Sequence, residues 1–467
     1  MKLHFLGANR QVTGSRYCLE VGDDRVMIDC GMFQERPYLD RNWDECPLAA
    51  SEFKALVLTH AHVDHCGLIP KFVREGFGGP ILCTRPTVEL TEVILRDAAR
   101  IQSEDVKYKK RRHSKEGRKG KHPEVALFTE EDVETTIPKL QGIPYGKKQP
   151  VTDAIDVTFH DAGHILGSAM LQFHVRENGR EQTVLFSGDI GQWGKPLIRD
   201  PSLFTRADYV VMESTYGDRE HVDGGSIEHQ LEEVINETVG RGGNVVVPTF
   251  AVERSQELMY YISRLVHADR IADIPVFLDS PMAIDVTEIF RLFRDCFDES
   301  TWQLITSNEP PLRFPGLRMV RSSQDSREIN KLKSPHIVMS TSGMCTAGRI
   351  KHHLRHNVGD ARSTILFVGY QAHGTLGRQI LEGNPIVRIH GREWKVKAQV
   401  RRIDGFSGHA DRSGLLRWIA NLNDAPKEIF LTHGEEEAAR SFAKLLAEQL
   451  KWKASVPAYR ETVELSS

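Results

Sequence analysis

Short apolar segments that each end in a polar turn recur along this chain. Three examples are Lys54–Leu58 before Thr59-His60, Thr183–Phe186 before Ser187-Gly188-Asp189, and Lys427–Leu431 before Thr432-His433-Gly434. Together with intervening amphipathic stretches, such segments predict alternating strands and helices, with largely parallel pairing in the middle of the chain. Ligands of open α/β sheets bind outside the carboxyl ends of the strands. The pattern therefore predicts an α/β fold whose chemistry gathers at one edge.

The densest polar cluster is His60-Ala61-His62-Val63-Asp64-His65, directly after an apolar strand. His60 and His62 are two residues apart, so on extended backbone their side chains point the same way and can bind one cation. Asp64 and His65 follow a turn and precede Gly67–Val73, which is predicted to be a helix, so they can face a second cation. Imidazole and carboxylate ligands suit zinc. A pair of surface histidines is the alternative interpretation.

Six residues cannot fully ligate two metal ions, so further ligands must come from later strand ends. His164 follows the alternating segment Val157–His160, and Asp189 and His433 each follow an apolar strand. A carboxylate at Asp189 is placed to bridge two cations. Taken alone, a histidine or aspartate in a turn is more often an ordinary hydrogen-bonding residue, but together with the first cluster each of the three fills a vacancy.

These motifs resemble those of the metallo-β-lactamase superfamily, and the rest of the chain resembles its β-CASP branch of RNA-processing nucleases. The acidic residue that ends a strand in Met212-Glu213-Ser214, the histidine of Ser407-Gly408-His409 and the histidine of Thr432-His433-Gly434 carry the second resemblance. A histidine at the last of these positions is typical of the members that act on RNA.

The resemblance implies a fold, a domain order and a set of ligands. The fold is α/β: a metallo-β-lactamase αββα sandwich with an inserted parallel α/β β-CASP domain. Residues 1–205 form the first part of the sandwich, 206–395 the insert and 396–467 the rest. Two Zn²⁺ ions are implied. The ligands of one are His60, His62, His164 and Asp189, and those of the other are Asp64, His65, Asp189 and His433.

The implied reaction is hydrolysis of phosphodiester bonds in single-stranded RNA by internal cutting, and additional 5′-to-3′ degradation from an end is left open. Two metal ions activate water and neutralise phosphate charge. The leaving oxygen needs a proton, for which His409 is the candidate, with Glu213 holding it protonated. Asp64 is counted with the catalytic residues as well as with the ligands. Ser342, Gly343 and Arg378 are candidates for contacts with the phosphate backbone, and Asp29 is either support for a ligand or a turn residue.

Composition excludes other classes of protein. The chain has 467 residues, too many for one ordinary core, and is 40% hydrophobic and 27% charged, as in globular proteins. Its apolar runs are too short to span a bilayer, and no secretion signal is expected. Seven scattered cysteines indicate neither a disulfide framework nor a CxxC zinc site, which favours the cytoplasm. The oligomeric state stays open, although relatives often form homodimers.

One segment departs from the net charge of −3: Lys107–His122 carries nine Lys or Arg residues against one acid, Glu116. It is either a solvated loop or helix end, or an arm that binds phosphates. Two alternatives to the ribonuclease also remain. One is a hydrolase of thioesters or lactones on the same zinc core, against which the insert, Glu213 and His409 argue. The other is a non-catalytic RNA-binding subunit, which we would expect to have lost metal ligands.

Overall fold

The computed structural model describes residues 1–117, 121–222 and 224–466. The chain divides into two compact units. Unit 1 comprises Met1–Trp193, Asp200–Glu220 and Gly408–Ser467, and unit 2 comprises Gly194–Arg199 and His221–Ser407. The domain limits expected from the sequence stay a prediction, because they refer to domains of the family, whereas these units are defined by contacts within the chain. Among the described residues, no helix combines the length and the apolar character needed to cross a membrane.

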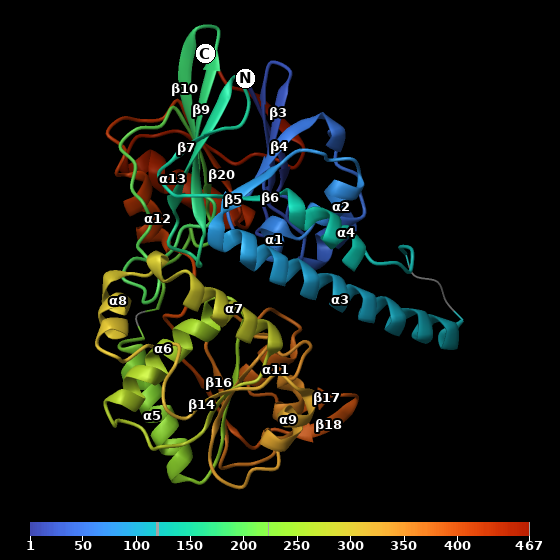
Figure 1. The fold of residues 1–467 in the computed structure, drawn as a ribbon, viewed down its shortest axis with the longest axis vertical. Coiled ribbons are helices and arrows are strands. Elements are labelled where there is room, and N and C mark those ends of the chain that lie inside the picture. The colour runs from blue at the N-terminus through green and yellow to red at the C-terminus, as the bar shows by residue number, and fades with distance from the viewer. Residues whose placement is uncertain (118–120, 223, 467) are drawn as a thin grey trace. The chain divides into compact units, whose positions relative to one another are not determined.

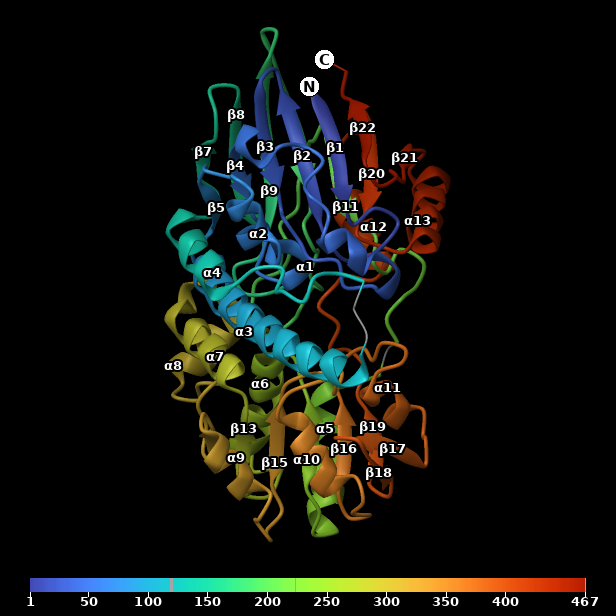
Figure 2. The ribbon, with the colours of Figure 1, turned by 90° about the vertical axis from the view of Figure 1, so that its right-hand side faces the viewer.

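Unit 1 contains two seven-stranded sheets. The first has the order β22-β1-β2-β3-β4-β5-β6, with strands at Glu461–Glu464, Lys2–Gly7, Arg16–Val21, Asp24–Ile28, Phe53–Val57, Ile81–Thr84 and Leu140–Ile143. The strands β22, β1, β2 and β3 pair antiparallel, and β3 to β6 pair parallel. Figure 2 shows β1, β2 and β3 side by side.

The second sheet has the order β21-β20-β11-β10-β9-β8-β7, with strands at Ala454–Ser455, Glu428–Thr432, Tyr209–Glu213, Arg180–Phe186, Ala169–Glu177, Ile155–Asp161 and Lys148–Pro150. Its strands β10, β11 and β20 are parallel neighbours, although β20 is more than 200 residues beyond β11 in sequence. The carboxyl ends of these three strands therefore lie at the same edge of the sheet, just before Ser187, Ser214 and His433.

Alternating side chains on the second sheet enter two different cores. On β11, Tyr209 and Val211 belong to a core shared with the first sheet, whereas Val210 and Met212 pack in another core with helices α12 (Arg412–Ile419) and α13 (Glu436–Gln449). Strand β11 is therefore covered by the first sheet on one face and by helices on the other.

Helices lie outside both sheets of unit 1, which makes it an αββα sandwich (Figure 1). Beside the first sheet are α1 (Val63–Cys66), α2 (Ile69–Arg74), α3 (Arg85–Glu116) and α4 (Glu130–Thr136). Short 3₁₀ turns occur at Arg36–Asn42, Ala50–Glu52 and Ile137–Lys139.

The helix predicted over Gly67–Val73 is observed as α2, at Ile69–Arg74, and a separate short helix, α1, precedes it at Val63–Cys66. Pro70 lies in the first turn of α2, where its missing N–H breaks no helical hydrogen bond. Asp64 and His65 were predicted to lie in a turn before a helix, but they belong to helix α1.

Unit 2 is built on a six-stranded sheet in which all strands are parallel, as predicted for the middle of the chain. Its order is β14-β13-β15-β12-β16-β19, with strands at Leu317–Met319, Val276–Leu278, Ile337–Ser340, Val245–Pro248, Thr364–Phe367 and Gln399–Arg402. A separate hairpin joins β17 (Ile386–Ile389) to β18 (Arg392–Lys395).

The helices of unit 2 connect these strands. They are α5 (Ile227–Gly240), α6 (Arg254–His267), α7 (Pro281–Leu292), α8 (Glu299–Thr306), α9 (Ser323–Ile329), α10 (Ile350–Asn357) and α11 (Leu376–Leu381), with a 3₁₀ turn at Arg294–Cys296. Leu354 of α10 and Ile380 of α11 pack against Val246 and Ile365 of the central strands. Helices α5 and α6 lie on the other side of the sheet from α9 and α11 (Figure 1).

Candidate metal centre

The first four residues of the candidate centre are held in place by backbone contacts around α1. His60 follows β4, His62 precedes α1, and Asp64 and His65 lie within it. The backbone of Asp64 accepts a hydrogen bond from Ser15 N at 2.8 Å, and that of His65 from Cys30 N at 2.7 Å. A side chain at Gly31 would meet the Asp64 carbonyl oxygen at 1.6 Å, so this close approach requires glycine.

Four of the predicted ligands form one cluster: His60, His62, His164 and Asp189. The Nδ1 atom of His62 lies 3.1 Å from Nε2 of both His60 and His164. The Oδ2 atom of Asp189 lies 3.4 Å from Nε2 of His60 and 3.5 Å from Nε2 of His164. These four atoms, from three separate loops, face one point.

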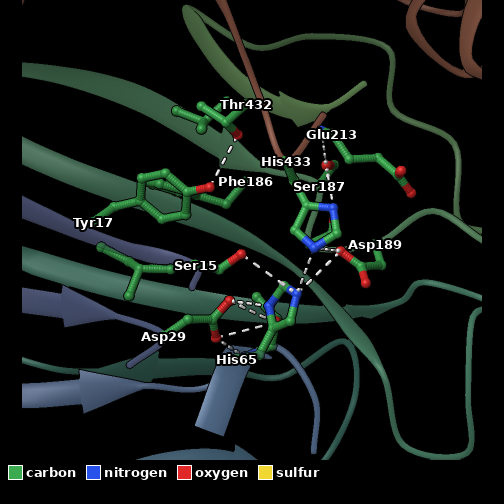
Figure 3. Close-up of a pocket in the computed structure, with 14 residues that line it drawn as sticks. Ser15, Tyr17, Asp29, His65, Phe186, Ser187, Asp189, Glu213, Thr432 and His433 are labelled. Atoms are coloured by element: carbon green, nitrogen blue, oxygen red, sulfur yellow. Dashed lines mark hydrogen bonds and ion pairs between the residues drawn. The ribbon is translucent and has the colours of Figure 1, made fainter. Parts of the chain in front are cut away.

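The other three predicted ligands form a second cluster: Asp64, His65 and His433. The Nε2 atoms of His65 and His433 are 3.1 Å apart, and Nε2 of His433 is 3.6 Å from Oδ2 of Asp64. The other oxygen of Asp189, Oδ1, lies 3.3 Å from His65 Nε2 and 3.5 Å from His433 Nε2. Figure 3 shows His65, His433 and Asp189 pointing toward one another.

The donor atoms fit metal ions on two independent grounds. First, a tetrahedral zinc site with bonds of about 2.0–2.1 Å keeps neighbouring donors about 3.3 Å apart, and the separations in both clusters are close to that value. Second, Asp189 Oδ1 is buried and accepts no hydrogen bond from the described residues. A buried carboxylate oxygen without a hydrogen-bond donor is unfavourable, and a cation beside it would remove that penalty.

Contacts outside the clusters orient four of the five histidines. The Nδ1 atoms face acceptors: Asp29 Oδ2 at 2.7 Å for His65, the Gly408 carbonyl oxygen at 3.0 Å for His164, and hydroxyl oxygens of Thr59 and Thr215 at 3.1 Å for His60 and His433. Donation from Nδ1 leaves Nε2 with a lone pair toward the cluster, as in metal sites. Asp29 therefore supports His65, and is more than a turn residue.

Charge in the clusters suits cation binding. Burial lowers the pKa of His60 to about 3 and of His62 to about 4, so both rings are neutral and free to act as ligands. Burial also opposes charge on Asp189, but the surrounding histidines outweigh it and hold the pKa of this carboxyl well below its ordinary value. Burial likewise opposes a proton on His433, and the Asp189 carboxylate outweighs it, so the pKa of His433 is raised. A cation at this position would displace that proton.

His409 and Glu213 form a pair beside the clusters. The Nδ1 atom of His409 lies 3.1 Å from both carboxylate oxygens of Glu213, and Glu213 Oε1 also accepts from Ile190 N at 2.6 Å. The His409 ring centroid is 4.6 Å from that of His164. Burial lowers the pKa of His409, but the Glu213 carboxylate outweighs burial and raises it to about 9. The ring is therefore protonated at neutral pH.

The three predicted substrate-binding residues all lie in unit 2. Ser342 and Gly343 follow β15, and Arg378 lies in α11. The Ser342 hydroxyl accepts from Thr346 N at 3.1 Å, and Arg378 pairs with Glu382 at 2.7 Å. These contacts serve local structure, and a role for the three residues in substrate binding stays a prediction.

Sequence reasoning missed the backbone and hydroxyl partners of the ligands, namely Thr59, Thr215 and Gly408. Thr59 and Thr215 could have been found, because each directly follows a strand in a polar turn. The Gly408 carbonyl carries no side-chain signal, and it contacts a residue 244 positions away.

Comparisons with known proteins agree with this geometry. Residues 12–234 match the metallo-beta-lactamase superfamily, residues 255–380 the Beta-Casp domain, and residues 393–457 the Zn-dependent metallo-hydrolase RNA specificity domain. Ribonuclease TTHA0252 of Thermus thermophilus is 38% identical over 447 residues, which cover 96% of each chain.

More distant relatives include the transcription termination factor FttA of Methanocaldococcus jannaschii, 32% identical over 98% of this chain and 70% of that protein. FttA of Methanosarcina mazei is 31% identical over 98% of this chain and 71% of that protein. The crystal structure of a protein of unknown function from Enterococcus faecalis V583 has a TM-score of 0.58 at 14% identity and covers 99% of both chains. At that identity the likeness concerns the fold alone.

Proposed function

This chain belongs to the β-CASP branch of the metallo-β-lactamase superfamily and is a ribonuclease-type hydrolase, and on that premise we propose that two zinc ions serve it in hydrolysing phosphodiester bonds of single-stranded RNA. The observation that carries the proposal is the division of seven ligand-type side chains into two clusters that share Asp189, one oxygen to each. Such sharing is typical of two-metal hydrolases.

In the proposed mechanism, His60, His62, His164 and Asp189 hold one ion and Asp64, His65, Asp189 and His433 the other. Two zinc ions, when bound, acidify water and neutralise charge on the phosphate. The protein's part is to fix the ligands: Asp29 and Thr215 keep the lone pairs of His65 and His433 directed inward. A preorganised site of this kind needs no rearrangement when charge develops during the reaction.

His409 is proposed as the general acid for the leaving ribose oxygen. Its Nδ1 atom is held by Glu213, which leaves Nε2 to donate a proton. Glu213 is itself buried and fixed by Ile190 N, so the ring has one preferred orientation. A correctly placed acid accelerates such a step by about 10²–10⁴-fold.

Further expectations remain proposals. They are binding of the phosphate backbone by Ser342, Gly343 and Arg378, additional 5′-to-3′ activity, a homodimer, and division into domains at 205/206 and 395/396. A cytoplasmic location is supported by the seven cysteines, which all lie in the described residues and are all unpaired. The complete ligand set argues against a non-catalytic subunit.

The test combines zinc analysis with cleavage of labelled single-stranded RNA. We expect about two zinc ions per chain in the wild type, no cleavage by Asp64→Ala, and cleavage by His409→Ala that is slower by about 10²–10⁴-fold with both ions still bound. The matched control is His174→Ala, a histidine on β9 away from both clusters. An unchanged rate in His409→Ala would refute the acid assignment, and preferential hydrolysis of a thioester over RNA would refute the substrate.

A further inference from the structure

The basic segment Lys107–His122, predicted as either a solvated stretch or a phosphate-binding arm, forms the C-terminal end of helix α3 as far as Glu116. Residues 118–120 lie outside the described residues, and Lys121 and His122 lie on the chain beyond the helix. From Lys107 to Glu116, every residue but His113 is exposed. Arg112 pairs with Glu116 and His113 with Glu124. Among the described residues, no carboxylate pairs with Lys107, Lys109, Lys110, Arg111 or Lys115.

Four of these cations share one face of the helix. Lys107, Lys110, Arg111 and Lys115 are separated by three, one and four residues, and positions three or four apart are neighbours on a helix surface. At 1.5 Å per residue the row is about 12 Å long. Tyr108, whose side chain is 66% exposed, lies beside this row. We call the four cations and Tyr108 the α3 arm.

Among the described residues, those on either side of the α3 arm, and not the arm itself, contact other parts of unit 1. The backbone N–H of Leu127 donates to Gln102 Oε1 at 2.9 Å. On the returning chain, His122 stacks on Trp43 with ring centroids 5.0 Å apart and also pairs with Asp40. Figure 1 shows the last turns of α3 extending past α4 within this unit. These contacts hold a charged helix end in a defined place.

A row of like charges destabilises its own helix. Lys107 and Arg111, and Arg111 and Lys115, are pairs four residues apart, and like charges at that spacing repel. The chain has a net charge of −3, yet no carboxylate of the described residues pairs with this row. A polyanion laid along the row would offset the repulsion and release counterions.

We propose that the α3 arm binds the phosphate backbone of single-stranded RNA outside the metal centre and so holds the substrate near the enzyme. This inference rests on the proposed function for its choice of polyanion. The exposed Tyr108 ring favours RNA over an anionic membrane or an acidic protein, because unpaired bases stack on aromatic side chains. Cations next to an aromatic ring are the usual composition of single-strand binding surfaces.

The experiment measures how RNA affinity depends on salt. The arm variant carries Lys107→Gln, Lys110→Gln, Arg111→Gln and Lys115→Gln, because glutamine keeps the helix propensity of the row. The matched control makes the same change of net charge at Arg96, Arg100, Arg440 and Lys444, which are all paired with carboxylates. Both are made in the His409→Ala background, and an unstructured RNA of about 30 nucleotides is bound at salt concentrations from about 50 to 200 mM.

We expect the slope of log affinity against log salt to fall by about 3 in the arm variant, since each neutralised phosphate contributes about 0.7. Between the two salt limits, the arm variant should therefore lose about 50-fold less affinity for RNA than the wild type does. The control variant should keep the wild-type slope. Equal slopes in the arm variant and the control would overturn the inference. It would also be overturned if the arm variant lost binding to phosphatidylserine vesicles or to polyglutamate but still bound RNA as the wild type does.

A small substrate separates this inference from the proposed function. With His409 restored, bis(p-nitrophenyl) phosphate is too short to reach the arm, so the arm variant should hydrolyse it at the wild-type rate. If the wild type cleaves neither this diester nor RNA when loaded with zinc, the proposed function fails. If both are cleaved and the salt slope is unchanged, only the arm assignment fails.

Discussion

Replacing Asp29 with asparagine should weaken one metal site and leave the other intact. Asp29 Oδ1 accepts from Thr59 N at 2.8 Å, while Oδ2 accepts from His65 Nδ1 at 2.7 Å. Asparagine has only one oxygen, so its amide nitrogen must face one of these two donors. If the amide nitrogen faces His65, it donates to Nδ1, so the ring proton must move from Nδ1 to Nε2. The Nε2 atom is the one directed at His433 and Asp189.

The backbone tolerates this change, which makes the magnitude interpretable. Asp29 has φ = 56°, in the left-handed region that asparagine also adopts readily. Loss of such a supporting contact weakens metal binding by about 10–100-fold, or about 1.4–2.7 kcal/mol. The effect should be confined to the site of Asp64, His65 and His433.

The assay is a zinc titration against a chromophoric chelator. Wild type should show two tight sites, and Asp29→Asn one tight site and one weakened by the factor above. Asp208→Asn is the matched control, because Asp208 accepts from Thr183 N at 2.8 Å in a similar turn away from the clusters. Two tight sites in Asp29→Asn would refute the idea that Asp29 sets the tautomer of His65.

Two other predictions concern the framework. Gly31→Ala should disturb α1, because the new methyl group would meet the Asp64 carbonyl oxygen at 1.6 Å. We expect a loss of about 1–3 kcal/mol in the free energy of unfolding and weaker zinc binding, whereas Gly78→Ala, with open space around it, should change neither. In unit 2, burial opposes charge on Asp279, but hydrogen bonds from His353, Ser326 and Arg349 lower its pKa. The resulting stabilisation is present above pH ~4 and is lost as the pH falls through the lowered pKa. The stability difference between wild type and Asp279→Asn in urea unfolding should therefore shrink below pH ~4, and a constant difference would contradict the prediction.

Five of the seven ligand-type residues could be selected from the sequence because each follows a strand in a polar turn, and Asp64 and His65 were selected because they lie within five residues of His60. Spacing alone placed His60 and His62 on one cation. Selection of Asp189 and His433 needed the further premise that parallel strands end at a common edge, which β10, β11 and β20 satisfy. His164 follows β8, which pairs antiparallel with both of its neighbours.

Other features depend on contacts that no local pattern carries. His62 faces its cluster with Nδ1, whereas His60 and His164 use Nε2, and this choice follows from backbone position and not from residue type. Helix α1 was missed because its four residues, Val63–Cys66, are too few to show a helical apolar pattern. The secondary structure of the basic segment could not be predicted, because a run of charged residues is compatible with both a loop and a helix.

Unit 1 is assembled from three separate stretches of chain, and this has a consequence for synthesis. Strand β20 lies inside the second sheet, and β22 pairs with β1 at the edge of the first. A nascent chain that has emerged as far as residue 400 carries His60, His62, His164 and Asp189 but neither His409 nor His433. While a ribosome translates this protein, its own RNA is therefore nearby for most of elongation, when the proposed nuclease centre is still incomplete.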